Sequence, residues 1–166
     1  MKTNACRMLD ALGILYETRE YEVDLDDLSG QTVARKIGLP PEQVFKTLLC
    51  RVDAEPIVFA VLSVADELDF KKLAAAASGR RAELVPIQEV QPLTGYIRGG
   101  VTVFGSKKPF PVFVEETIEI FDIISVSAGM RGLQILLTPA DYIRAAEAQA
   151  IDLTRASMVS HSGDAK

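Results

Sequence analysis

Lys46, in the segment VFKTLLC, is the residue whose type and setting most clearly suggest chemistry. The segment is typical of a β-strand, in which alternate side chains point to the same face. Lys46 would then share a face with Val44, Leu48 and Cys50, so an ammonium group would lie among apolar side chains. One interpretation is a cation that lines a pocket and binds a carbonyl or phosphate oxygen. The other is a lysine whose stem packs while its head reaches water.

Two later segments could present main-chain donors to a ligand. In GYIRGG and the following VFGSKK, the glycines would let the backbone approach a bound group closely. In SVSAGMRGLQI, Ser125, Ser127 and Gly129 could offer hydroxyl and amide groups beside Arg131. Tight turns between strands would produce the same residues, so each segment alone is also consistent with an ordinary hairpin.

The residue inventory argues against several common mechanisms. His161 is the single histidine and stands close to the C-terminus, which makes a Ser-His-Asp or Cys-His catalytic unit improbable. The sequence has no HExxH or paired CxxC motif for zinc, and its glycines match neither GxxxxGK[ST] nor GxGxxG. We therefore expect no metal and no cofactor.

Composition predicts one globular domain. The chain has 166 residues, of which 48% are hydrophobic and 25% charged, and its net charge is −5. That balance argues against a protein that coats nucleic acid, although it leaves room for a local basic face. Cys6 and Cys50 are far apart and are predicted to be buried thiols. We expect a cytoplasmic protein, because no signal peptide or membrane span is apparent.

Periodicity and turn residues predict interleaved helices and strands. Helices are expected over 3–13, from the N-cap Ser29 to Gly38, from the N-cap Asp69 to a left-handed Gly79, from Pro86, and over 139–149. Strands are expected over 15–23, 44–52, 55–64 and 82–85, within a loop-plus-strand segment over 94–116, and in a pair that meets at the turn AGMRG. The fold class is therefore a mixed α/β domain whose central sheet is curled and flanked by helices.

Four separated motifs together resemble the YbaK/EbsC family of aminoacyl-tRNA editing proteins, which is related to the insertion domain of bacterial prolyl-tRNA synthetases. The motifs, in chain order, are GLPPEQVFKTLLC, LDFKKLA, TGYIRGGVTVFGSKKPFPVFVEE and ISVSAGMRGLQI. The resemblance covers residues 1–155 as one domain, and we expect residues 156–166 to form a disordered tail. It implies the prolyl-tRNA synthetase-associated-domain fold.

The resemblance also implies an activity and a site. Proteins of this family hydrolyse the amino acid from the 3′ end of mischarged tRNA, commonly Cys from tRNA(Pro), and Lys46 corresponds to their essential lysine. Tyr21 corresponds to a tyrosine associated with the pocket. The loop that surrounds the aminoacyl group and the terminal adenosine corresponds to a segment containing Gly99, Gly100, Thr102 and Gly105. The turn that faces this loop corresponds to a segment containing Ser127, Gly129 and Arg131.

Two departures from the family pattern bear on the amino acid that is removed. The glycine loop reads GGVTVFG where much of the family has GGxSPxG, so we expect Phe104 to shrink or reshape the pocket. Gln134 stands where relatives of the Cys-specific type often have an acidic residue. The alternatives are a deacylase for another amino acid, such as Ala-tRNA(Pro), or a non-catalytic module that binds an aminoacyl or nucleotide group. A partner synthetase, prolyl-tRNA synthetase, is a candidate for delivering the charged tRNA.

Overall fold

A computed structural model describes residues 2–155, which form two β-sheets with helices around them. The α-helices are α1 (Asn4–Ala11), α2 (Gly30–Ile37), α3 (Phe70–Ala76), α4 (Ile87–Thr94) and α5 (Pro139–Ala146). The strands are β1 (Glu17–Glu20), β2 (Phe45–Val52), β3 (Ile57–Ser63), β4 (Ala82–Leu84), β5 (Val112–Glu115), β6 (Ile124–Ser127), β7 (Leu133–Leu137) and β8 (Gln149–Ile151). Two short 3-10 helices cover Pro41–Gln43 and Glu116–Ile120.

The strands divide between a five-stranded and a three-stranded sheet. The larger sheet has the order β4-β2-β3-β5-β8, in which β2 is antiparallel to β3 and β4, whereas the β3–β5 and β5–β8 pairs are parallel. The smaller sheet, β1-β7-β6, is antiparallel, and a bridge between Val44 and Ser125 joins it to the start of β2. The prediction of a mixed α/β fold is confirmed, although its strands form two sheets rather than one.

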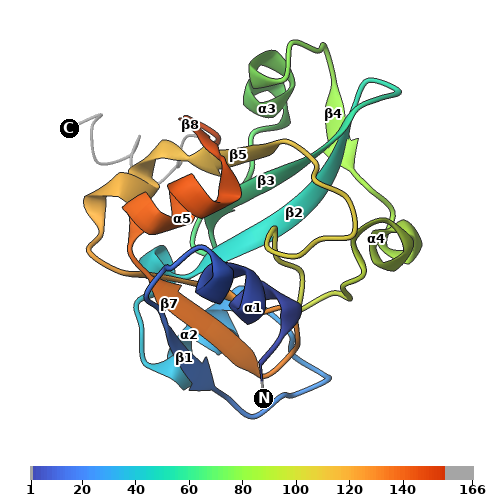
Figure 1. Cartoon of the computed structure of the whole chain (residues 1–166). Coiled ribbons are helices and arrows are strands. Elements are labelled where there is room, and N and C mark those ends of the chain that lie inside the picture. Colours follow the sequence, from blue (N-terminus) through green and yellow to red (C-terminus); the bar gives the residue numbers. More distant parts are fainter. Residues whose placement is uncertain (1, 156–166) are drawn as a thin grey trace, which may run out of the picture.

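Helices cover the sheets on several sides. Figure 1 shows α1 and α5 on the near side of the strands, and α4 at the outer edge beyond β2. Ser29 and Asp69 cap α2 and α3 with their side chains, and Gly38 ends α2 in the left-handed conformation, as the sequence predicts. Among the helices of residues 2–155, none is long and apolar enough to span a membrane.

Several predicted boundaries differ from the structure. The first strand is limited to β1, because only Glu17–Glu20 pair with β7. The residue with positive φ after α3 is Ser78 (φ 61°), not Gly79. The last helix ends at Ala146, since Glu147 has φ 51° and the chain then turns into β8 at Gln149. The predicted tail, with its single histidine, lies outside the described residues.

The hydrophobic core occupies both faces of the five-stranded sheet. On one face, Phe45 and Leu49 pack with buried residues of α1, β6, β7 and α5. On the other face, Cys50 packs with Leu73 of α3 and with neighbouring strands. Cys6 and Cys50 are free and buried, as predicted, and burial raises the pKa of the Cys50 thiol to about 12. Strand β2 therefore has a fixed position between two cores.

Candidate active site

A cavity of ≈ 540 Å³ opens along the outer edge of the first half of β2. Strand β4 is short and pairs only with Cys50–Val52, so no strand covers residues 45–49 on that side. We call this space the β2-edge cavity. Its walls come from residues 28–33 at the start of α2, residues 44–49, residues 84–90 around β4 and α4, residues 98–101, and from Val64, Ser127 and Gln134.

The open edge offers main-chain polar groups to the cavity. The Leu49 carbonyl accepts a hydrogen bond from Val85 N–H at 2.9 Å, on the side away from β3. Residues two apart in a strand direct their main-chain groups to the same side, so the N–H and C=O of Thr47 face the cavity. Within residues 2–155, no acceptor is recorded for the Thr47 N–H. An unpaired edge of this kind can receive a ligand's donors and acceptors.

Lys46 lines the same cavity and is partly buried. Its Nζ donates to the Asp66 carbonyl oxygen at 2.9 Å, and it forms no ion pair with a carboxylate of the described residues. Burial lowers the pKa of Lys46, while the negative charges of Asp66 and Glu67 oppose this shift. The ammonium group is thus held in a single-acceptor contact that an anion could replace.

The two glycine-rich segments pack against each other at the mouth of the cavity. Arg131 Nε donates to the Arg98 carbonyl oxygen at 2.8 Å, and Gly99 lines the cavity with φ 89°. The backbone of Gly100 lies close to Met130, because a Cβ added at Gly100 would be only 3.0 Å from Met130 Cα, closer than carbon atoms normally approach. The predicted facing arrangement of these segments is therefore present.

The main-chain amides that are open at the cavity differ from those of Gly100 and Gly129 in the two segments. Gly100 N–H donates to the Ile97 carbonyl at 2.8 Å and Gly129 N–H to Ser127 Oγ at 3.2 Å, so both are already engaged. The N–H groups of Gly99 and Val101 have no recorded acceptor among the described residues, and both residues line the cavity. The amides of Thr47, Gly99 and Val101 are therefore open at the cavity, whereas those of Gly100 and Gly129 are not.

Of the nine candidate site residues, three line the cavity: Lys46, Gly99 and Ser127. Thr102 is 1% exposed and its Oγ1 accepts from Phe104 N–H at 3.4 Å, which stabilises the loop from inside. Gly105 and Gly129 pack against Tyr96, since a Cβ on either would lie 3.0 Å from the tyrosine ring or hydroxyl. These three residues shape the loops and do not border the cavity.

Phe104 is not a pocket residue, and the prediction that it reshapes the pocket is wrong. Its side chain is fully buried in the core, with its ring edge-on to Tyr142 at a centroid distance of 5.3 Å. The residue two positions earlier along the same loop, Thr102, is buried as well, whereas Val101 faces the cavity. The aromatic substitution in GGVTVFG therefore fills the interior behind the loop.

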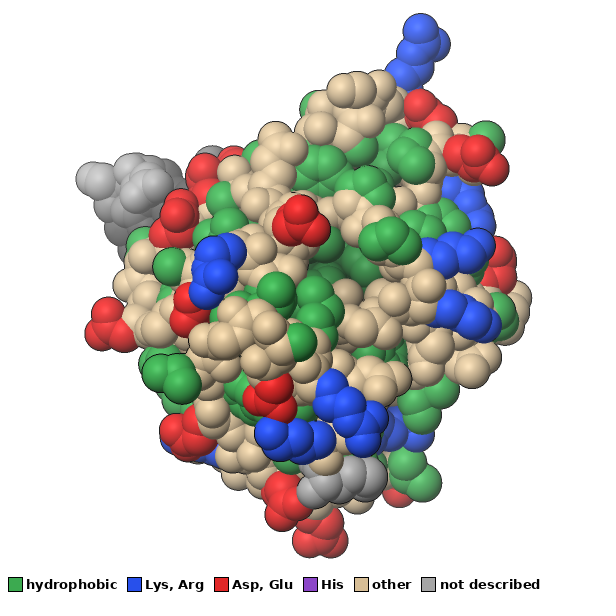
Figure 2. Space-filling view, in the orientation of Figure 1, with side chains coloured by type: hydrophobic (Ala, Val, Ile, Leu, Met, Phe, Trp, Pro, Cys, Tyr) green, Lys and Arg blue, Asp and Glu red, His purple; other side chains and the backbone are tan. Residues whose placement is uncertain are grey.

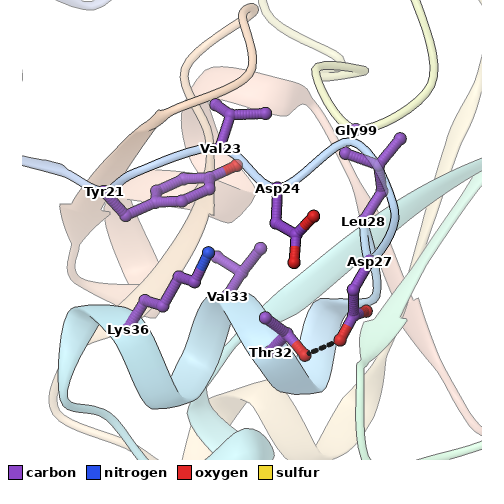
Figure 3. Close-up of a pocket in the computed structure, with 9 residues that line it drawn as sticks. All are labelled: Tyr21, Val23, Asp24, Asp27, Leu28, Thr32, Val33, Lys36 and Gly99. Atoms are coloured by element: carbon purple, nitrogen blue, oxygen red, sulfur yellow. Dashed lines mark hydrogen bonds between the residues drawn. The ribbon is translucent and has the colours of Figure 1, made fainter.

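Tyr21 lies beside the β2-edge cavity rather than in it. Figure 3 shows its ring over the side chain of Lys36, next to a small pocket of ≈ 10 Å³. This pocket shares Leu28, Val33 and Gly99 with the cavity wall. Tyr21 is therefore separated from Lys46 by the wall that these three residues form.

Carboxylates on the loop before α2 are organised by local hydrogen bonds. Asp27 accepts from Thr32 Oγ1 at 2.6 Å, as drawn in Figure 3, and from Ser29 N–H at 3.1 Å. These bonds, of which the one from Thr32 has the largest effect, lower the pKa of Asp27 to about 2.

Among residues 2–155, no group of three or more His, Cys, Asp or Glu is arranged to hold a metal ion.

Sequence reasoning missed the apolar wall of the cavity, which comes from Leu84, Ile87 and Val90. Leu84 and Ile87 are 51% and 61% exposed, and neighbouring exposed apolar side chains often mark a binding surface. Their exposure depends on the fold, so the sequence alone does not reveal it. Gln134 also borders the cavity, and its Oε1 accepts from the buried Ser125 hydroxyl at 2.7 Å. A neutral amide whose oxygen is hydrogen-bonded thus borders the cavity at this position.

Comparison with known proteins decides the family. Residues 28–145 match the aminoacyl-tRNA editing domain family, and this range contains Lys46 and both glycine-rich segments. The chain belongs to this family. Membership confirms the resemblance to the YbaK/EbsC proteins that the four motifs indicate.

Individual relatives of this editing-domain chain support the assignment. An Enterococcus faecalis protein named as the Cys-tRNA(Pro)/Cys-tRNA(Cys) deacylase EbsC is 37% identical over 153 residues, which cover 92% of this chain and 93% of the relative. The Escherichia coli protein named multifunctional Ser/Thr-tRNA deacylase ProXp-y is 30% identical over 129 residues, 75% of this chain and 77% of the relative. A crystal structure described as that of a trans-editing enzyme for prolyl-tRNA synthetase superposes with a TM-score of 0.78 at 21% identity, over 94% of this chain and 99% of the other. That likeness establishes the shared fold.

Proposed function

We propose that this editing-domain chain is an aminoacyl-tRNA deacylase that removes Cys from mischarged tRNA(Pro) in the cytoplasm. The observation that carries the proposal is the position of Lys46, a cation without a carboxylate partner among the described residues, at the open edge of a cavity of ≈ 540 Å³. Its setting fits a phosphate or ester oxygen at the 3′ end of tRNA. The name of the E. faecalis relative, which shares 37% identity, supports Cys as the amino acid.

In the proposed reaction, the substrate supplies its own nucleophile. The Cys thiol attacks the ester carbonyl carbon, a C–S bond forms, and the C–O bond to the terminal adenosine breaks. The thiol proton ends on the released ribose hydroxyl, and water later opens the resulting thiolactone to free Cys. Lys46 exchanges the Asp66 carbonyl for a substrate oxygen, and the amides of Thr47, Gly99 and Val101 orient the carbonyl.

Water is the nucleophile in the alternative reaction, the removal of an amino acid without a thiol, such as Ala. The neutral Gln134 and the apolar wall at Ile87 and Val90 are compatible with a small apolar side chain. In that case the terminal ribose hydroxyl and the open amides would hold the attacking water. The two alternatives use the same cavity and the same lysine.

Deacylation rates on matched substrates test the proposal. Cys-tRNA(Pro), Ala-tRNA(Pro) and Ser-tRNA(Pro) are prepared with the same tRNA, and loss of the amino acid is followed with and without the protein. We expect Cys to be lost fastest, because only Cys carries a thiol that reaches its own ester carbonyl. Faster loss of Ala would transfer the assignment to the water-dependent reaction. Loss of none of the three above the buffer rate would refute the deacylase proposal.

We also propose that a synthetase delivers the charged tRNA. The net charge of −5 predicts modest affinity for tRNA by the chain alone. In the view of Figure 2, acidic and basic side chains are interspersed, so this face presents no extended surface of one sign. Sedimentation of the protein with prolyl-tRNA synthetase and tRNA(Pro) should show a ternary complex at micromolar concentrations. Independent sedimentation of the three components would contradict this part of the proposal.

A further inference from the structure

Two segments next to the β2-edge cavity carry positive charge without any carboxylate. Residues 94–114 contain Arg98, Lys107 and Lys108, residues 123–140 contain Arg131, and neither segment has an Asp or Glu. The chain as a whole carries a net charge of −5. We call these four side chains the basic ledge.

Contacts place Arg98 and Arg131 at the cavity and Lys107 beside the end of α4, and Lys108 follows Lys107 in the chain. Arg98 lines the cavity, and its carbonyl oxygen accepts from Arg131 Nε at 2.8 Å. Lys107 N–H donates to the Thr94 carbonyl at 2.9 Å and its Nζ lies 3.5 Å from the Pro92 carbonyl, so Lys107 is at the C-terminal end of α4. Because Ile87 and Val90 of α4 line the cavity, this helix connects Lys107 to the apolar wall.

The charges of the basic ledge are not neutralised by the protein. None of its four side chains forms an ion pair within residues 2–155, whereas Lys2, Arg51 and Lys72 each pair with a carboxylate. The positive charge of Lys107 is stabilised by the dipole of α4, because its Nζ lies near a carbonyl in the last turn of that helix. Arg98 and Lys108 are exposed, with no hydrogen-bond partner recorded for their side chains in the described part of the chain.

A loop of the opposite charge borders the cavity beside Gly99, since Asp24, Asp27 and Gly99 line one small pocket. The loop between β1 and α2 contributes Leu28 to the cavity wall. Five carboxylates lie just before Leu28 in the chain, namely Glu20 at the end of β1 and Glu22, Asp24, Asp26 and Asp27 in the loop. A polyanion that approached over this loop would be repelled, while the ledge would attract it. The basic and acidic parts of the cavity border therefore favour approach of a polyanion over the ledge.

The backbone beneath the ledge is held by buried contacts. Tyr96 Oη donates to the Phe104 carbonyl at 2.6 Å, and the Thr94 hydroxyl accepts from Tyr96 N–H at 3.0 Å. Both Thr94 and Tyr96 are buried. A fixed backbone limits the positions of the cations it carries, which lowers the ordering cost of binding a charged ligand.

We infer that the basic ledge binds backbone phosphates of the tRNA acceptor strand and thereby directs the aminoacylated 3′ end into the β2-edge cavity. This inference rests on the proposed function, because it assumes that tRNA is the substrate. The ledge contributes to the binding of tRNA, whereas Lys46 acts on the terminal nucleotide.

The test compares Lys107→Gln/Lys108→Gln with the control Lys71→Gln/Arg80→Gln. Lys71 and Arg80 are exposed, form no recorded ion pair and belong to the region of α3, away from the cavity. We expect the ledge variant to raise KM for Cys-tRNA(Pro) roughly tenfold while kcat changes little. The dependence of log(kcat/KM) on log salt concentration should become shallower by about 1 for each lysine that contacts a phosphate. The control should match the wild type.

Two further measurements keep this inference separate from the deacylase proposal. A Cys ester of adenosine lacks the acceptor strand, so the ledge variant should deacylate it as fast as the control does. Binding of uncharged tRNA(Pro) tests the ledge even if no deacylation is found. It is measured at salt concentrations from about 50 to about 200 mM, over which phosphate contacts weaken strongly. Equal salt dependence of binding in the ledge variant and the control would overturn the inference. An equal loss of activity on the adenosine ester and on tRNA would also overturn it.

Discussion

Lys46→Ala is expected to lower kcat/KM for Cys-tRNA(Pro) by about 100- to 1000-fold, the usual cost of removing one preorganised donor from an active site. Its ammonium group lies in the β2-edge cavity with a single recorded acceptor, the Asp66 carbonyl. In the Lys46→Ala variant, the cavity would retain its open amides but would lack a cation to stabilise negative charge on the substrate. Initial rates at substrate concentrations below KM measure this effect.

Stability measurements show whether that loss is catalytic. Burial lowers the pKa of Lys46, so the protonated lysine is less favoured in the folded than in the unfolded state near neutral pH. Removing its charge should therefore not destabilise the fold, and thermal unfolding of Lys46→Ala should resemble that of the wild type. Lys71→Ala, at an exposed position, is the matched control and should keep full activity. Near-normal turnover by Lys46→Ala would remove the lysine from the mechanism.

Phe104→Ala is expected to lower the free energy of unfolding by about 3–5 kcal/mol, the usual cost of truncating a large aromatic side chain in a core. Phe104 is fully buried and packs edge-on against Tyr142, so alanine would leave a cavity between the glycine loop and α5. Denaturant unfolding followed by circular dichroism measures the change. The size of the effect distinguishes a core residue from one that borders an open pocket.

Specificity provides the second measurement at this position. Phe104→Leu keeps an apolar side chain and should lose less stability than Phe104→Ala does. Because Phe104 does not line the cavity, the ratio of the Cys-tRNA(Pro) and Ala-tRNA(Pro) rates should be unchanged in Phe104→Leu. A variant that folds normally yet reverses this preference would show that Phe104 contacts the amino acid after all.

Local signals in the sequence predicted most of the secondary structure. Ser29 and Asp69 cap helices because their side-chain oxygens accept from main-chain N–H groups two or three residues later, a relation that involves only neighbouring residues. Alternation in VFKTLLC correctly placed Lys46 and Cys50 on the same face of a strand. The end of α5 was missed because Glu147 adopts φ 51°, a conformation that its residue type does not indicate.

The cavity itself could not be predicted from local patterns. It exists because β4 pairs with only three residues of β2, and the length of that pairing depends on where the chain runs after α3. The same limitation applies to Phe104 and Gly129, which the loop pattern placed at a pocket. The structure instead packs both against residues distant in sequence, Tyr142 and Tyr96 respectively. Long-range packing thus decides which residues of a motif line the cavity.

The most direct test of the account is the amount of Cys released from Cys-tRNA(Pro) when the substrate is present in large excess over the protein. We predict that wild-type protein releases many equivalents of Cys per molecule, and that Lys46→Ala stays close to the buffer rate. This result would establish a catalyst that depends on the lysine in the β2-edge cavity. Binding of the tRNA without release, or release that stops at one equivalent, would contradict the account and favour a non-catalytic binding module.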